Sequence, residues 1–161
     1  MSSGGNPRRV AGIVVGEAAS AELMSPAKDR MPEQHADNAP LVLVVEDEVL
    51  IRMAAADHLR SCGFKVAEAG NAAEARELIL SGLKVDLVFS DITMPGPMDG
   101  VAFCQWLHEH APDIPVILTS GVTSSLNAAK QACQNVRRLE PKPYDYDGIV
   151  TQIRTALTAR A

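Results

Sequence analysis

The sequence has little positive charge and no long apolar run. Its 161 residues carry 15 Lys and Arg against 20 Asp and Glu, which gives a formal net charge of −5. Proteins that bind nucleic acid usually carry a clustered basic face, so this balance argues against direct DNA binding. No apolar stretch approaches the ~18 residues that a membrane helix needs. We therefore expect neither a nucleic-acid partner nor a membrane partner.

The chain also has few cysteines, which are Cys62, Cys104 and Cys133. They are odd in number, far apart and in no CxxC pair, so they predict neither a disulfide framework nor a zinc site. Buried, reduced thiols are the simplest interpretation, and they fit a protein of the reducing cytoplasm. We expect a cytoplasmic location.

The first 39 residues differ in composition from the rest of the chain. They are rich in Ser, Gly, Ala, Pro and charged residues and show no sustained apolar period, which is typical of a flexible tail. A length of 161 residues allows one domain with a proper core and some spare sequence. The prediction is a flexible N-terminal extension over residues 1–39 and one domain over residues 40–161.

Short apolar runs alternate with helical periods through the predicted domain. Apolar residues three or four apart, such as Ile51, Ala55 and Leu59, predict amphipathic helices between the runs. Alternating strands and helices imply right-handed βαβ units and a parallel sheet that helices cover on both faces. The fold class is therefore α/β with three layers. Its five expected strands are Leu41–Val45, Phe64–Ala67, Val85–Phe89, Pro115–Leu118 and Val136–Leu139.

Several helix ends are visible in the sequence. Gly63 and Gly82 are expected to end the first two helices, and Asn71 with Glu74 is expected to begin the second. The fourth helix, around residues 124–134, has the weakest pattern. The fifth helix runs to the end of the chain, so we expect no attached output domain. One apolar face of this helix carries Ile149, Ile153, Ala156 and Leu157.

Acidic or polar residues follow four of the five predicted strands. In an open α/β sheet, ligands bind outside the carboxyl ends of the strands. Carboxylates placed together repel one another unless a cation relieves them, and Mg²⁺ prefers oxygen ligands. Each such residue taken alone is more simply a helix cap, a turn former or an exposed charge, but their coincidence favours a site for phosphoryl transfer to a carboxylate. The four strand ends are Glu46-Asp47-Glu48, Ser90-Asp91, Thr119-Ser120-Gly121 and Glu140-Pro141-Lys142-Pro143.

Four segments, VVEDE, VFSDITMPGPMDG, PVILTSG and EPKPY, resemble in this order and spacing the signature segments of response-regulator receiver domains. The resemblance covers about residues 41–159 and implies the flavodoxin-like (βα)5 fold with strand order 2-1-3-4-5. It implies a single-domain regulator of a two-component system, similar to chemotaxis receivers, that receives a phosphoryl group from a histidine kinase or a histidine phosphotransfer protein. Such a chain signals by binding a downstream protein and assists only its own phosphorylation and dephosphorylation, so it is not expected to be an enzyme.

The resemblance also implies a Mg²⁺ site and its ligands. Glu46 and Asp47 would be the acidic pair that holds the ion, Glu46 through a water molecule. Asp91 would be a third acidic ligand, and the backbone carbonyl of Thr93 would complete the protein ligands.

The same resemblance implies the residues that carry the chemistry. Asp91 would be the phosphoacceptor, Ser120 the switch hydroxyl and Lys142 the cation that contacts the phosphoryl group. The Lys142–Pro143 peptide bond would be cis. Many receivers carry Tyr or Phe three residues before the lysine, whereas this chain has Leu139 there, which weakens the usual coupling between hydroxyl and aromatic ring. The segment MPGPMDG is also one residue longer than the common form.

Two other functions stay open at this point. A receiver-like interaction module that accepts no phosphate would be favoured by the loss of Asp91 or Lys142, and both are present. A phosphatase with an aspartyl-phosphate intermediate would need a second acid two residues after the nucleophile, where this chain has Thr93.

Overall fold

The structure of the chain is a computed structural model that describes residues 38–159. Residues 1–37 of the expected N-terminal extension lie outside the described residues. Within residues 38–159, strands and helices alternate as the apolar pattern predicts. In chain order they are β1 (Leu41–Val45), α1 (Val49–Ser61), β2 (Lys65–Ala69), α2 (Ala72–Leu80), β3 (Leu87–Asp91), α3 (Gly100–His110), β4 (Val116–Ser120), α4 (Thr123–Ala132), β5 (Val136–Pro141) and α5 (Tyr146–Thr158).

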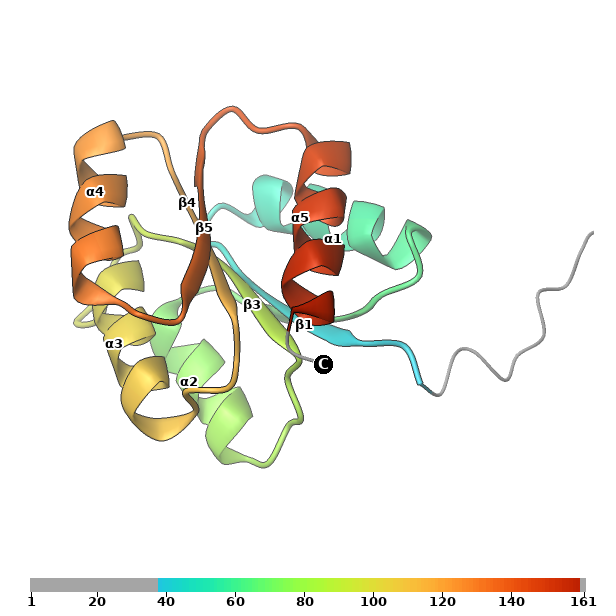
Figure 1. Cartoon of the computed structure of the whole chain (residues 1–161), viewed down its shortest axis with the longest axis horizontal. Helices are drawn as coiled ribbons and strands as arrows, with labels where there is room; N and C mark the ends of the chain where they lie inside the picture. The colour runs from blue at the N-terminus through green and yellow to red at the C-terminus, as the bar shows by residue number, and fades with distance from the viewer. Residues whose placement is uncertain (1–37, 160–161) are drawn as a thin grey trace, which may run out of the picture. The chain divides into compact units, whose positions relative to one another are not determined.

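The five strands form one parallel sheet in the order β2-β1-β3-β4-β5. Figure 1 shows α2, α3 and α4 on one side of this sheet and α1 and α5 on the other. The expected three-layer α/β fold and its strand order are therefore confirmed. Because the strands are parallel, their carboxyl ends all lie along the same edge of the sheet.

Each face of the sheet has its own apolar core, which explains the nearly continuous apolar runs of the strands. Leu43 and Val45 of β1 pack with the helices α2, α3 and α4. Val42 and Val44, which point to the opposite face, pack with α1 and α5. A strand buried on both sides needs apolar residues at every position, so the sequence shows a run rather than an alternation.

Four of the five strands extend further toward their carboxyl ends than the apolar runs predict. The third strand was expected over Val85–Phe89 but lies over Leu87–Asp91. Backbone pairing continues into the polar residues, because Asp91 pairs with Thr119 and Ser120 pairs with Pro141. Consequently Asp91 and Ser120 are strand residues rather than loop residues, and the sheet itself holds them in place.

The helix ends agree with the expected signals. Gly63 and Gly82 follow α1 and α2 with φ of 91° and 92°, the left-handed region that favours glycine. At the start of α2, Asn71 Oδ1 accepts a hydrogen bond from the Glu74 N–H at 2.9 Å. Glu74 Oε2 in turn accepts from the Gly70 N–H at 2.7 Å, so this cap closes one residue earlier than a standard capping box.

All three cysteines are free thiols, with Cys104 and Cys133 buried and Cys62 half-buried. Burial raises the pKa of both the Cys104 and the Cys133 thiol. No helix among residues 38–159 combines the length and the apolar character that crossing a bilayer requires.

Candidate functional site

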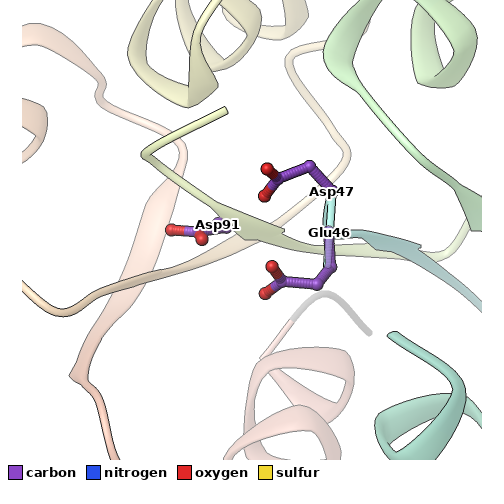
Figure 2. Close-up of side chains that lie close together, drawn as sticks. All are labelled: Glu46, Asp47 and Asp91. Carbon is purple, nitrogen blue, oxygen red and sulfur yellow. The ribbon is translucent and has the colours of Figure 1, made fainter. Parts of the chain in front are cut away.

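Three carboxylates meet at the carboxyl edge of the sheet. Glu46 and Asp47 directly follow β1, and Asp91 is the last residue of the neighbouring strand β3. One oxygen atom from each of the three side chains lies within 4.8 Å of the others. Figure 2 shows the Glu46 and Asp47 side chains extending toward the side on which Asp91 lies. The three predicted acidic residues are therefore together in space.

Two of these carboxylates are almost removed from solvent. Glu46 is 4% exposed and Asp91 is 6% exposed, whereas Asp47 is exposed. Burial is the largest influence on Glu46 and raises its pKa; a hydrogen bond from Lys142 opposes this rise, and the charge of Asp91 adds to it. Buried carboxylates this close need a cation to stay ionised together.

Lys142 supplies one such cation from the end of β5. Its Nζ donates to Asp91 Oδ2 at 2.8 Å and to Glu46 Oε2 at 2.9 Å. Burial acts to lower the pKa of Lys142, but the hydrogen bonds and charges of Asp91 and Glu46 together raise it above its ordinary value. Lys142 is therefore positively charged and holds two buried acids in one arrangement.

The backbone around Lys142 is fixed from two sides. Its N–H donates to the Ser120 carbonyl at 2.9 Å, which joins the ends of β5 and β4. The Lys142–Pro143 peptide bond is cis, as the resemblance implied. Beside it, the Tyr144 ring packs edge-on against Phe89 with ring centroids 5.6 Å apart. These contacts place the ammonium group over the acidic cluster.

Ser120 lies at the end of β4 and is fully buried. Its Oγ accepts a hydrogen bond from the Val122 N–H at 3.0 Å, so the hydroxyl is engaged with the loop that leads into α4. Thr93 follows Asp91 at the neighbouring strand end, and its N–H donates to Asp91 Oδ1 at 3.1 Å. The structure thus brings Glu46, Asp47, Asp91 and Lys142 into one cluster, with Ser120 at the end of β4 and Thr93 on the loop after β3 beside it.

Comparison with known proteins agrees with this geometry. Residues 42–154 match the family model "Response regulator receiver domain". The chain belongs to the response-regulator receiver family. It is 34% identical over 134 residues to the sensor kinase CckA of Brucella abortus, an alignment that covers 81% of this chain but 14% of that kinase.

Two solved receiver structures are also similar to this chain. The response regulator receiver protein of Sinorhizobium medicae superimposes with a TM-score of 0.69 at 28% identity, covering 76% of this chain and 98% of that one. The response regulator TrrA of Thermotoga maritima, solved in complex with Mg(2+)-BeF, has a TM-score of 0.65 at 25% identity and covers 73% of this chain and 98% of its own.

The receiver differs from the common pattern at Leu139. This side chain is half-buried and packs against the core on the α2, α3 and α4 side of the sheet, and its backbone pairs with Leu118. An aliphatic side chain at this place contributes to the core, but it cannot offer the ring that many receivers move inward when the switch hydroxyl shifts.

Sequence reasoning missed Arg52 as a supporting residue of the site. Its Nη1 donates to the Glu46 carbonyl at 2.7 Å, and its Nε lies 3.6 Å from Glu68 Oε2. Arg52 thereby ties the acidic turn after β1 to α1 and β2. No sequence signal would have found it, because an arginine six residues after an acid is common on helix surfaces.

Gly100 is a second residue that the sequence analysis left without a role. A Cβ at this position would lie 2.3 Å from the Asp91 carbonyl oxygen and 2.6 Å from Ile92 Cα. The Gly100 N–H also donates to the Ile92 carbonyl at 2.9 Å. The start of α3 therefore approaches the backbone at the end of β3 at a distance that only glycine allows. A glycine at the first position of a helix, where most residues are tolerated, was the available signal.

Proposed function

We propose that this receiver accepts a phosphoryl group on Asp91 from a histidine kinase or a histidine phosphotransfer protein, and that the phosphorylated form binds a downstream protein. The observation that carries the proposal is the placement of Lys142 Nζ, 2.8 Å from Asp91 Oδ2 and 2.9 Å from Glu46 Oε2. A carboxylate whose nearest cation is already in place suits phosphoryl transfer, where positioning and charge neutralisation supply most of the catalysis.

The proposed reaction moves the phosphoryl group from nitrogen to oxygen. An Asp91 carboxylate oxygen forms the new P–O bond while the P–N bond to the donor histidine breaks. The histidine ring keeps the bonding electron pair and takes up a proton. Lys142 stays charged through this step because its partners raise its pKa, so its ammonium group can transfer from the Asp91 oxygen to an oxygen of the phosphoryl group.

A Mg²⁺ ion fits the residues present. The donor set is three carboxylates with oxygen atoms within 4.8 Å of one another, and hard oxygen ligands are what this ion prefers. Glu46, Asp47 and Asp91 would hold it, with the Thr93 carbonyl as a further ligand. Bound there, the ion would supply positive charge that offsets the repulsion between the acids and the phosphoryl group. The Mg(2+)-BeF complex of the structurally similar TrrA supports this assignment.

Ser120 is the residue through which we expect the signal to leave the site. Its Oγ, which accepts from the Val122 N–H, would turn to donate to a phosphoryl oxygen. The loop at Gly121 and Val122 would then lose one hydrogen bond and move with the start of α4. Because Leu139 offers no ring to follow this movement, the change should reach the α4, β5 and α5 face mainly through that loop.

Exposed apolar residues next to the site support a protein donor. Val49, Leu50 and Met53 of α1 are 54%, 80% and 50% exposed and follow the acidic turn directly. A cavity of about 470 Å³ adjoins this surface, lined in part by Ile51, Pro143 and Tyr144. Apolar side chains gathered on one surface favour contact with another protein. A donor that docks here would bring its phosphohistidine close to Asp91.

The experiment that tests the proposal uses beryllofluoride with Mg²⁺ as a stand-in for the phosphoryl group. NMR spectra of the native chain should change at Asp91, Ser120 and the loop to α4 when beryllofluoride is added. Asp91→Asn should show no such change, because its neutral amide cannot replace the carboxylate that binds beryllofluoride. Asp47→Ala should respond only at a Mg²⁺ concentration about tenfold higher or more, because one ligand is lost.

The same experiment separates the alternatives. A native chain that ignores beryllofluoride at every Mg²⁺ concentration would favour a phosphorylation-independent interaction module. Covalent label on Ser120 or on a histidine, when a small phosphodonor replaces beryllofluoride, would contradict Asp91 as the acceptor. A single-domain mode of action stays a prediction, since the alignment with CckA covers only 14% of that kinase. A cytoplasmic location also stays a prediction.

A further inference from the structure

Charge is distributed unevenly along the receiver. Residues 41–122 carry 12 acidic and 5 basic side chains, whereas residues 123–161 carry 3 acidic and 6 basic ones. The three acids of the second group, Glu140, Asp145 and Asp147, lie between the end of β5 and the start of α5. The whole of α4, the first half of β5 and α5 beyond its first turn therefore carry cations and no acids.

A groove lies within this cationic part of the molecule. It has a volume of about 340 Å³ and is lined by residues of β5, the edge strand of the sheet, and of α5. We call it the β5–α5 groove. Figure 1 shows these two elements adjacent to each other, with α4 on the other side of β5. The groove is lined by Arg137, Arg138, Thr151, Gln152, Thr155, Ala156 and Ala159.

An irregularity in β5 explains why two consecutive arginines line the same groove. Val136 pairs with Val116 of β4, but the next residue of β4, Ile117, pairs with Arg138. Arg137 is therefore an extra residue, the bulge of this strand pair. Successive side chains of a regular strand point to opposite faces, and a bulge changes that direction locally. The bulge gives the groove two guanidinium groups instead of one.

The groove also contains an acceptor without a donor. Gln152 Oε1 is buried and has no hydrogen-bond partner among the described residues. A buried carbonyl oxygen in this situation is uncommon, because it has lost its hydrogen bonds to water without gaining others. A ligand with N–H groups, such as a peptide backbone, can satisfy it. A phosphodiester backbone has no N–H group and cannot.

We propose that the β5–α5 groove binds an extended acidic segment of a protein partner. The inference rests on the proposed function in that this partner is the downstream protein to which the receiver signals. Charge complementarity carries the choice of ligand, because Arg137 has no acidic partner among the described residues, while Arg138 is already 3.3 Å from Glu140. A second copy of the chain is disfavoured because its equivalent face is cationic as well.

The test is a titration with a fluorescein-labelled oligoglutamate peptide at low ionic strength, followed by fluorescence anisotropy. Arg137→Glu should weaken the affinity by about tenfold, because it removes an attraction and adds a repulsion. Gln152→Met keeps the side-chain length but removes the acceptor, and should weaken it by about threefold. Amide signals of Arg137, Gln152 and Thr155 should shift when the peptide binds to the native chain.

Lys84→Glu is the matched control. It changes the net charge by the same amount at an exposed position between α2 and β3, and should leave the affinity within about twofold of native. The inference is wrong if Lys84→Glu weakens binding as much as Arg137→Glu, or if an oligothymidylate binds more tightly than oligoglutamate. It is also wrong if sedimentation shows that the groove closes a dimer.

Asp91→Asn separates this inference from the proposed function. The titration needs no phosphoryl group, so Asp91→Asn should bind the peptide as the native chain does. A failure of oligoglutamate to bind contradicts the groove as a site, whereas a failure of beryllofluoride to act on Asp91 contradicts the phosphoacceptor function.

Discussion

At the scale of single residues, Glu46 is where burial and charge oppose each other most directly. Its carboxylate is 4% exposed, belongs to a cluster with Asp47 and Asp91, and receives one hydrogen bond from Lys142 at 2.9 Å. One cation beside two buried acids leaves the cluster short of positive charge. This shortage is the physical reason for a divalent ion at the site, and it also makes the metal-free protein sensitive to pH.

The sign of that sensitivity follows from the pKa of Glu46. Burial, and to a lesser extent the charge of Asp91, hold this pKa above its ordinary value of 4.5, although Lys142 opposes the rise. A carboxyl group whose pKa is raised in the folded state contributes stability that is complete below pH 4.5. This stability is lost as the pH rises through the pKa of the folded state. Glu46→Gln cannot ionise, so it should gain stability relative to the native chain as the pH rises from 4.5 to neutral.

Urea unfolding in EDTA at the two ends of this pH range measures the difference. Glu109→Gln, at an exposed position on α3, serves as the control and should show no change in its difference from native. If the stability of Glu46→Gln relative to native is the same at both pH values, Glu46 ionises as freely in the folded chain as in the unfolded one.

At the scale of elements, the start of α3 and the end of β3 depend on each other through Gly100. Gly100→Ala places a Cβ against the Asp91 carbonyl oxygen, where only 2.3 Å is open. The backbone must move to admit it, so we expect a loss of about 1–3 kcal/mol in the free energy of unfolding. Because the displaced backbone belongs to Asp91, the proposed phosphoacceptor, the variant should also need more beryllofluoride than the native chain.

Gly121→Ala is the control for this substitution, since a Cβ there meets nothing within 4 Å. Urea unfolding of both variants gives the comparison. Equal stability of Gly100→Ala and Gly121→Ala would mean that α3 can shift without cost, and the close approach would then have no role in holding Asp91.

The elements also show how far sequence reasoning reaches. The five strands were predictable from the apolar runs, and their order from the resemblance to receiver domains. The carboxyl ends of four strands were not predictable. In β3, for example, the apolar run stops at Phe89, whereas backbone pairing continues to Asp91. Apolar runs record which side chains are buried in the two cores. They do not record how far the backbone hydrogen bonds continue.

The sequence likewise allowed only part of the site to be predicted. Glu46, Asp47, Asp91 and Lys142 could be named because each lies at or just after a strand end, parallel strands end at one edge, and the resemblance points to the same positions. Arg52 and Gly100 could not be assigned a role, because each acts through a contact with the backbone of a distant segment. The bulge at Arg137 was hidden for a related reason, since register between two strands is not written in either strand alone.

At the scale of the whole molecule, the receiver separates its two kinds of surface by charge. The carboxyl edge of the sheet at Asp91 is acidic and needs cations, whereas α4, the first half of β5 and α5 beyond its first turn carry cations and no acids. The two surfaces should therefore attract different partners. If Asp91 is phosphorylated as proposed, the lifetime of its phosphoryl group sets how long the two surfaces act together.

We expect this phosphorylated state to be long-lived for a receiver. Hydrolysis requires a water molecule to attack the phosphoryl group from the side opposite the Asp91 oxygen, and a side chain that orients this water raises the rate by positioning it. We expect Thr93 and Val122 to flank that path, because they follow the ends of β3 and β4, which pair at Asp91 and Thr119. Threonine offers only a short hydroxyl, and Val122 is 52% exposed and has no side-chain hydrogen-bonding group.

The decisive comparison is with the double variant Thr93→Asn, Val122→Glu, which adds an amide and a carboxylate at the two positions. After labelling of Asp91 and removal of the phosphodonor, the variant should lose phosphate about tenfold faster than the native chain, because both new side chains can orient the attacking water. Thr93→Val, Val122→Leu is the matched control, since it changes both side chains without adding such a group, and it should decay as slowly as native. If the native chain and the polar variant decay at the same rate, water positioning at these two sites does not limit hydrolysis, and the duration of the signal is set elsewhere in the molecule.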